Sequence, residues 1–144
     1  MTTITRSALV KFTPQQMFDL VNDVEAYPAF LPWCRDSRII SQNDQIICAA
    51  LDIAKGGIHH EFSTRNVLTA GEAIRIELID GPFRHLEGFW QFSPIGADSG
   101  CRVQLDMDFE FSTRLLDLAL GPVFTQISGS LVEAFCKRAR EIYG

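Results

Sequence analysis

The first candidate for chemistry is a run of three titratable residues, His59, His60 and Glu61. Imidazole side chains bind metal ions and transfer protons near neutral pH. Adjacent side chains on a β-strand point to opposite faces, so the two histidines cannot easily share one metal or one proton. His85, on another predicted strand, could meet one of them. The pattern favours polar positions on a half-exposed strand over a metal or acid–base site.

A second candidate is the set of carboxylates Asp106, Asp108 and Glu110, which alternate along one predicted strand. Paired carboxylates can act as acid and base. These three face away from the apolar side of the strand and therefore toward water. The sequence has no Gly-x-Ser-x-Gly elbow and no phosphate-binding glycine loop. We predict no catalytic residues, while an enzyme of the cyclase or dehydrase type, using His60 or His85 as acid–base, stays open as a third hypothesis.

The cysteines Cys34, Cys48, Cys101 and Cys136 are widely spaced and form no Cys-x-x-Cys pair. A structural zinc site needs clustered ligands, which these spacings do not supply. The sequence therefore predicts reduced structural thiols and no metal.

Length and composition indicate one domain spanning residues 1–144, with a net charge of −5 and 47% apolar residues. This excludes a disordered chain and a basic nucleic-acid binder, so no direct DNA binding is expected. No secretory signal is recognisable, and the most apolar stretch, Leu115–Phe124, is short for a membrane span. We expect a cytoplasmic protein that visits membranes at most peripherally.

Hydrophobic periodicity predicts an α+β fold in the order β-α-α-β6-α. Thr13, Pro14 and Gln16 form a capping box that begins a helix, and a short helix runs from Val24 to Phe30. The predicted strands cover residues 3–12, 37–40, 45–55, 58–68, 74–79, 83–92 and 101–111, separated by turns that include 55–57 and a loop at 94–100. A last helix runs to Tyr143.

Two features of the C-terminal part indicate how the chain closes. Residues 101–111 alternate strictly between apolar and polar, which is typical of an antiparallel sheet covered on one side. Gly121-Pro122 in the last helix predicts a kink or a break. A curved antiparallel sheet of about seven strands, wrapped on this helix, is the natural closure.

The chain holds 11 Phe and 2 Trp, and several of these rings point to an internal pocket. Leu86, Gly88, Trp90 and Phe92 fall on one face of a strand, where Gly88 leaves a gap that suits a bulge or a ligand. We predict an apolar pocket between sheet and last helix, which would bind apolar ligands. Its predicted ligand-binding residues are Trp33, Phe83, Leu86, Trp90, Phe92, Phe109, Leu118 and Phe124. We predict that Trp90→Asp abolishes ligand retention and leaves the protein folded.

Several motifs together resemble the coenzyme Q-binding START-like family of the polyketide cyclase/dehydrase superfamily, over nearly the whole chain. The most specific is the block Tyr27-Pro28 with Phe30-Leu31-Pro32-Trp33-Cys34. Supporting ones are Gly81-Pro82-Phe83 with Leu86, Gly88, Trp90 and Phe92, then Phe109-Glu110-Phe111, and Phe135, Arg138-Ala139 and Tyr143-Gly144. The absence of a transit peptide resembles the family's bacterial branch, which includes a ribosome association toxin.

The resemblance implies a helix-grip (START/Bet v 1-like) fold with a cavity for a polyprenyl quinone such as ubiquinone. The main hypothesis is therefore non-enzymatic binding of that lipid in support of respiratory electron transport. For the toxin branch the resemblance implies binding to the large ribosomal subunit and blocking of subunit joining, which is the alternative. Both branches share these motifs. Aromatic residues around Tyr27–Trp33 could also contact a membrane or a partner.

Overall fold

The computed structural model describes residues 1–55, 57–96 and 100–144, so Gly56 of the predicted turn and residues 97–99 of the predicted loop lie outside the described residues. Within the described part, the elements follow the predicted order. They are β1 (Thr2–Val10), α1 (Pro14–Asn22), the 3-10 helix η1 (Val24–Ala29), β2 (Cys34–Gln42), β3 (Ile46–Lys55), β4 (Ile58–Thr69), β5 (Ala73–Asp80), β6 (Phe83–Pro94), β7 (Cys101–Phe111) and α2 (Arg114–Tyr143).

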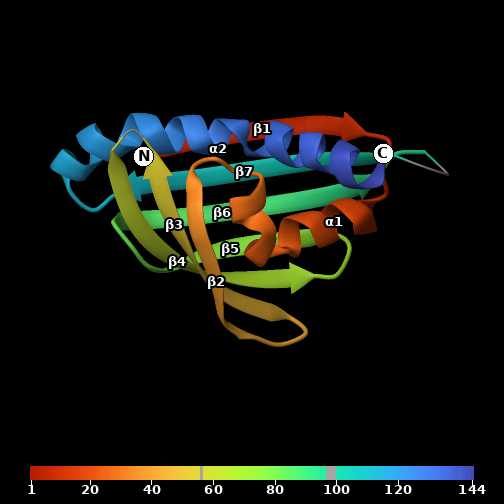
Figure 1. Cartoon of the computed structure of the whole chain (residues 1–144), viewed down its shortest axis with the longest axis horizontal. Helices are drawn as coiled ribbons and strands as arrows, with labels where there is room; N and C mark the ends of the chain where they lie inside the picture. The colour runs from red at the N-terminus through yellow and green to blue at the C-terminus, as the bar shows by residue number, and fades with distance from the viewer. Residues whose placement is uncertain (56, 97–99) are drawn as a thin grey trace.

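The strands form one antiparallel sheet, whose seven described members lie in the order β1-β7-β6-β5-β4-β3-β2. Strand β1 pairs with β7, so the N-terminal strand lies beside the last strand of the chain. Figure 1 shows the sheet curving, with α2 lying lengthwise along it and α1 near the C-terminal end of α2. The predicted helix-grip architecture is confirmed.

The predicted capping box at the start of α1 is also confirmed. The Thr13 hydroxyl accepts a hydrogen bond from the Gln16 backbone N–H at 3.1 Å, and the Gln16 side chain accepts one from the Thr13 N–H at 2.9 Å. Pro14 occupies the first turn, where a missing N–H costs nothing. The helix then buries Met17, Phe18, Leu20 and Val21 against the sheet.

Removal of this cap gives a first testable prediction. Thr13→Ala is expected to lower the free energy of unfolding by about 0.5–2 kcal/mol, because the Gln16 backbone N–H at the start of α1 loses its acceptor. Urea denaturation followed by circular dichroism measures the change. Thr125→Ala, at an exposed position inside α2, is the matched control and should cost nothing. Equal losses for both variants would contradict the capping role.

Strand β7 shows the alternation of apolar and polar faces that the sequence predicts. Cys101, Val103, Leu105, Met107, Phe109 and Phe111 are all buried. The carboxylates on the other face make structural contacts, since Asp108 accepts a hydrogen bond from the Thr3 hydroxyl at 2.7 Å and Glu110 lies 3.7 Å from Arg84. The solvent-facing interpretation of these carboxylates agrees with this geometry.

The sequence predicts a kink or a break at Gly121-Pro122, and the break is wrong, because α2 continues through Pro122 to Tyr143. Proline removes one helical hydrogen bond to the carbonyl four residues earlier, here that of Leu118. Both Pro122 and Leu118 are exposed, so water can satisfy that carbonyl.

Candidate functional site

The concave face of the sheet and α2 enclose a small cavity of about 70 Å³. Its wall is mainly apolar and comes from η1, the segment before β2, strands β3 to β7, and α2. The lining residues are Val24, Tyr27, Trp33, Ala49, Leu51, Phe62, Thr64, Asn66, Ile76, Leu86, Trp90, Met107, Phe124, Ile127, Ser128, Leu131 and Phe135.

Of the predicted site residues, Trp33, Leu86, Trp90 and Phe124 line this cavity. Phe83 and Phe109 lie beside it in an aromatic cluster with Phe124, where the ring centroids of Phe109 and Phe124 are 4.7 Å apart. Phe92 packs in the core against Phe18, at 6.0 Å. The geometry thus brings four predicted residues to the cavity and places three in the packing around it.

Leu118 does not fit the predicted pocket, because its side chain is 67% exposed. The residues of α2 that face the sheet include Leu120, Phe124, Ile127 and Leu131, at the three- and four-residue spacing of one helix face. That spacing places Leu118 on the opposite face. The prediction that Leu118 lines the cavity is therefore corrected.

The gap predicted at Gly88 is filled by its neighbours across the sheet. A Cβ atom at Gly88 would lie 3.3 Å from Ile76 Cδ1 and 3.4 Å from Met107 Cε, and both of those side chains line the cavity. The irregularity of β6 lies elsewhere, between Phe83 and His85. Phe83 and Leu86 are an odd number of positions apart and would face opposite sides of a regular strand. The irregularity allows both side chains to be buried.

Three buried polar residues at the cavity were missed by the sequence analysis: Thr64, Asn66 and Ser128. The Thr64 hydroxyl donates to Asn66 Oδ1 at 2.9 Å, and the Ser128 hydroxyl donates to Met107 Sδ at 3.4 Å. The available signal was that Thr64 and Asn66 share the strand face of Phe62. A few such groups in an apolar wall can orient a polar headgroup.

One end of the cavity is closed by the aromatic block that follows α1. The ring of Phe135 on α2 lies edge-on to Tyr27 at 5.4 Å, to Phe30 at 5.4 Å and to Trp90 at 5.5 Å. The Tyr27 hydroxyl donates to the Val21 carbonyl, and burial raises the pKa of Tyr27. The Tyr27–Cys34 motif therefore packs η1 and the following loop against α2.

The cavity volume limits what it can hold in this conformation. A volume of about 70 Å³ is about half that of an engineered apolar cavity of roughly 150 Å³ that binds benzene. Sites for small organic ligands usually measure about 300–1,000 Å³. A quinone could enter only if the wall moved outward.

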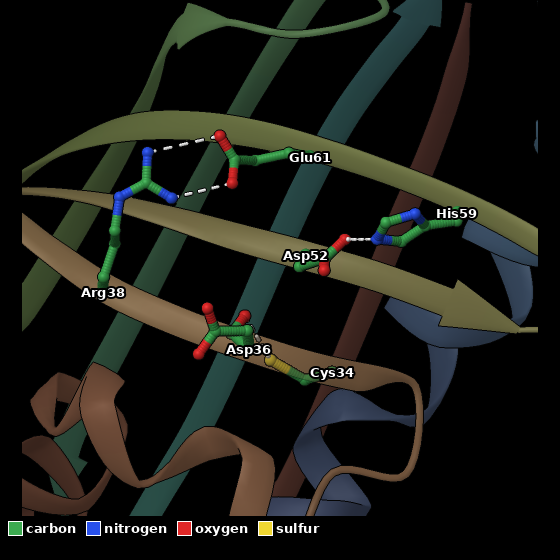
Figure 2. Close-up of polar contacts among 6 residues, drawn as sticks. All are labelled: Cys34, Asp36, Arg38, Asp52, His59 and Glu61. Carbon is green, nitrogen blue, oxygen red and sulfur yellow. Dashed lines mark hydrogen bonds and ion pairs between the residues drawn. The ribbon is translucent and has the colours of Figure 1, made fainter.

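A cluster of polar and charged side chains lies on the convex face of β2, β3 and β4 (Figure 2). Arg38 pairs with Glu61 at 2.7 Å, and Nε2 of His59 lies 2.6 Å from Oδ1 of Asp52. His60 instead lines a small depression with Ile53 and Phe83. The two histidines thus lie apart, as predicted, and over residues 1–55, 57–96 and 100–144 no group of three His, Cys, Asp or Glu could hold a metal.

The four cysteines are free, and their environments differ. Burial raises the pKa of Cys34 to about 11, and burial likewise raises that of Cys101 to about 11. Burial also raises the pKa of Cys136, whereas Cys48 is only half-buried. Only the thiolate reacts, so the three buried thiols should be inert in the folded protein.

Thiol labelling tests this arrangement. Ellman's reagent at pH 8 is expected to titrate one thiol in the native protein and four after unfolding in guanidinium. Cys48→Ser should remove the native reaction, and Cys136→Ser should leave it unchanged. Rapid native reaction of more than one thiol would contradict the packing of the core.

Comparison with known proteins shows which family this chain resembles. Residues 10–136 match the family described as polyketide cyclase / dehydrase and lipid transport. The ribosome association toxin RatA of Pseudomonas aeruginosa is 44% identical over 143 residues, which cover 99% of each chain. The mitochondrial coenzyme Q-binding protein COQ10 homolog B of Xenopus laevis is 30% identical over 96% of this chain and 58% of its own length.

The fold has solved counterparts at lower identity. The Zhui aromatase/cyclase of Streptomyces sp. R1128 superposes with a TM-score of 0.78 at 16% identity, over 96% of this chain and 93% of its own. The match to residues 10–136 and the near full-length relatives agree with the resemblance read from the motifs: this chain belongs to the polyketide cyclase / dehydrase and lipid transport family, with its START-like fold.

Proposed function

We propose that this protein associates with the ribosome, binds the large subunit and blocks subunit joining, and so inhibits translation. The observation that carries the proposal is the 44% identity to a protein named ribosome association toxin over 99% of both chains. The quinone-binding relative is more distant, at 30% identity, and matches over 58% of its own length. Ribosome contact also implies a cytoplasmic protein.

A surface groove between the Ala29–Trp33 segment and the second half of α2 is a suitable contact site. It measures about 500 Å³ and combines the apolar Phe30 and Pro32 with the basic Lys55, Lys137 and Arg138. The guanidinium of Arg138 lies 5.0 Å from the centre of the Phe30 ring. Glu133 and Glu141 also line the groove.

The charges of the protein favour contact through this groove over contact through a broad RNA-binding surface. The net charge of −5 opposes a broad RNA-binding surface, because binding to nucleic acid depends on neutralising its phosphates. The groove carries three basic and two acidic side chains beside the half-buried Phe30 and the exposed Pro32, and it can still contact RNA and protein together. The specific Tyr27–Cys34 motif forms part of this groove, which gives that motif a role at the surface as well as in the core.

Pelleting with purified large subunits tests the proposal. Wild-type protein is expected to co-sediment, and Lys55→Glu with Lys137→Glu is expected to weaken binding at least tenfold. The matched control is Lys11→Glu with Arg102→Glu, which changes the net charge equally at exposed positions away from the groove. Equal weakening by both pairs would show a general charge effect and contradict the groove.

A second function, binding of a hydrophobic ligand such as ubiquinone, is supported by the cavity and by the name of the Xenopus relative. Organic extraction of gently purified protein followed by mass spectrometry tests it. A quinone near one per protein is the expected result, and Ala49→Leu, which fills the cavity, should remove it. Protein without quinone from a quinone-rich host would contradict this function.

Enzymatic activity has weaker support. The cyclase of known structure shares 16% identity, which shows the fold alone. His60 and His85 carried the enzyme hypothesis, and His60 lies beside the apolar side chains of Ile53 and Phe83. Replacement of both histidines by Gln, with no change in any phenotype, would remove this hypothesis.

A further inference from the structure

The first half of α2 is apolar on its outer as well as its inner face. Its inner face buries Leu120 and Phe124 against the sheet. On the outside, Leu115 is 76% exposed and Leu118 is 67% exposed, and Ala119 and Pro122 are exposed between and beyond them. These four residues recur at the three- and four-residue spacing of one helix face. We call them the α2 outer face.

The middle of α2 carries no charge, unlike its C-terminal part. Residues 118–132 contain no Asp, Glu, Lys or Arg, whereas residues 133–141 contain Glu133, Lys137, Arg138, Arg140 and Glu141. By length and composition α2 could cross a membrane, yet it packs along the sheet, and 28% of its most apolar stretch of 18 residues is buried. An exposed apolar patch on a helix is typical of a surface that contacts a partner or a membrane.

Basic side chains lie next to this face. Arg84, 65% exposed, and Arg114 line one depression of about 280 Å³ at the beginning of α2. Glu110, 3.7 Å from Arg84, and Asp117 are in the same depression. Guanidinium groups beside an exposed apolar helix face are the arrangement with which interfacial helices contact anionic lipids.

We propose that the α2 outer face is a membrane-docking surface that inserts into the headgroup region of a bilayer containing anionic lipid, with Arg84 and Arg114 at the level of the phosphates. Four side chains expose on the order of a few hundred Å², below the roughly 800 Å² that each partner buries in a stable protein interface. A lipid surface fits this area, and Arg84 and Arg114 can reach its phosphates beside Glu110 and Asp117.

The position of the α2 outer face on the molecule is suitable for contact with a bilayer. Figure 1 shows the first turns of α2 at the end of the molecule opposite the C-terminus. Phe124 and Ile127, on the following turns, line the internal cavity. Docking would therefore place the helix that walls the cavity against the bilayer. This inference does not depend on the proposed ribosome contact, which uses the other half of α2.

Vesicle flotation tests the proposal with two lipid compositions, pure phosphatidylcholine and a mixture with phosphatidylglycerol. Wild-type protein is expected to float with the mixed vesicles and at least tenfold less with the neutral ones. Leu115→Gln with Leu118→Gln should reduce binding to mixed vesicles at least tenfold. The control Leu9→Gln with Ile40→Gln, at positions 71% and 54% exposed on other elements, should bind as wild type.

Three results would overturn the proposal. Wild-type protein that floats with neither vesicle has no docking surface. Equal binding by wild type and Leu115→Gln with Leu118→Gln would assign any flotation to charge alone. Loss of large-subunit pelleting by that variant, with unchanged flotation, would assign the face to the ribosome. For Leu115→Gln with Leu118→Gln we expect unchanged pelleting with large subunits and lost flotation with mixed vesicles. This pair of results keeps the test of membrane docking separate from that of the proposed function.

Discussion

Phe135→Ala is expected to lower the free energy of unfolding by about 3–5 kcal/mol. Phe135 is 1% exposed, and its ring meets those of Tyr27, Phe30 and Trp90 edge-on. Truncation removes the apolar surface that these rings bury and leaves a void joined to the existing cavity. Phe135 also holds the Tyr27–Cys34 motif against α2, so little in its surroundings can collapse to fill the space.

Urea denaturation measures this loss, with Leu118→Ala as the control at an exposed position of the same helix. The control should change stability by less than about 0.5 kcal/mol. The Phe135→Ala protein should also gain affinity for benzene, since engineered apolar cavities of about 150 Å³ bind it. Equal stability of the two variants would contradict the placement of Phe135 at the centre of the core.

Trp90→Asp is expected to abolish folding at 25 °C. Trp90 is 3% exposed, parallel to Phe92 at 6.2 Å and edge-on to Phe135. A carboxylate there would lose the packing of the indole and remain buried with no cationic partner among the cavity-lining residues. The loss of the indole costs about 3–5 kcal/mol and the buried carboxyl several more, which together are comparable to the roughly 5–15 kcal/mol by which domains are stable.

This expectation replaces the prediction from sequence that the same variant stays folded and only releases its ligand. The change follows from the burial of Trp90, which is 3% exposed among side chains that carry no cation. Trp90→Phe is the control and should remain folded, because it keeps an apolar ring. Circular dichroism and proton NMR distinguish the outcomes, and a native-like spectrum for Trp90→Asp would contradict the account of the core.

Local patterns in the sequence predicted the fold well where one physical rule dominated. The strict alternation of residues 101–111 gave the buried face of β7, and the capping box gave the start of α1. These features depend on neighbouring residues along the chain. The covering of the sheet by the last helix then followed from the need to bury one face of the sheet.

The site was harder to predict because it depends on contacts between distant elements. The helix face of Leu118 is decided by where α2 packs, and the Gly121-Pro122 pair suggested an interruption that water access on the exposed side makes unnecessary. The inward position of Thr64 and Asn66 follows from the pairing of β4 with β3 and β5. The volume left at Gly88 depends on the rotamers of Ile76 and Met107.

The central claim is that the protein acts on the ribosome, and sucrose-gradient sedimentation tests it most directly. Purified large and small subunits are allowed to join with and without the protein, and its position in the gradient is followed by immunoblot. We predict that the joined peak falls, the subunit peaks rise, and the protein sediments with the large subunit. An unchanged joined peak, with the protein at the top of the gradient, would contradict the claim.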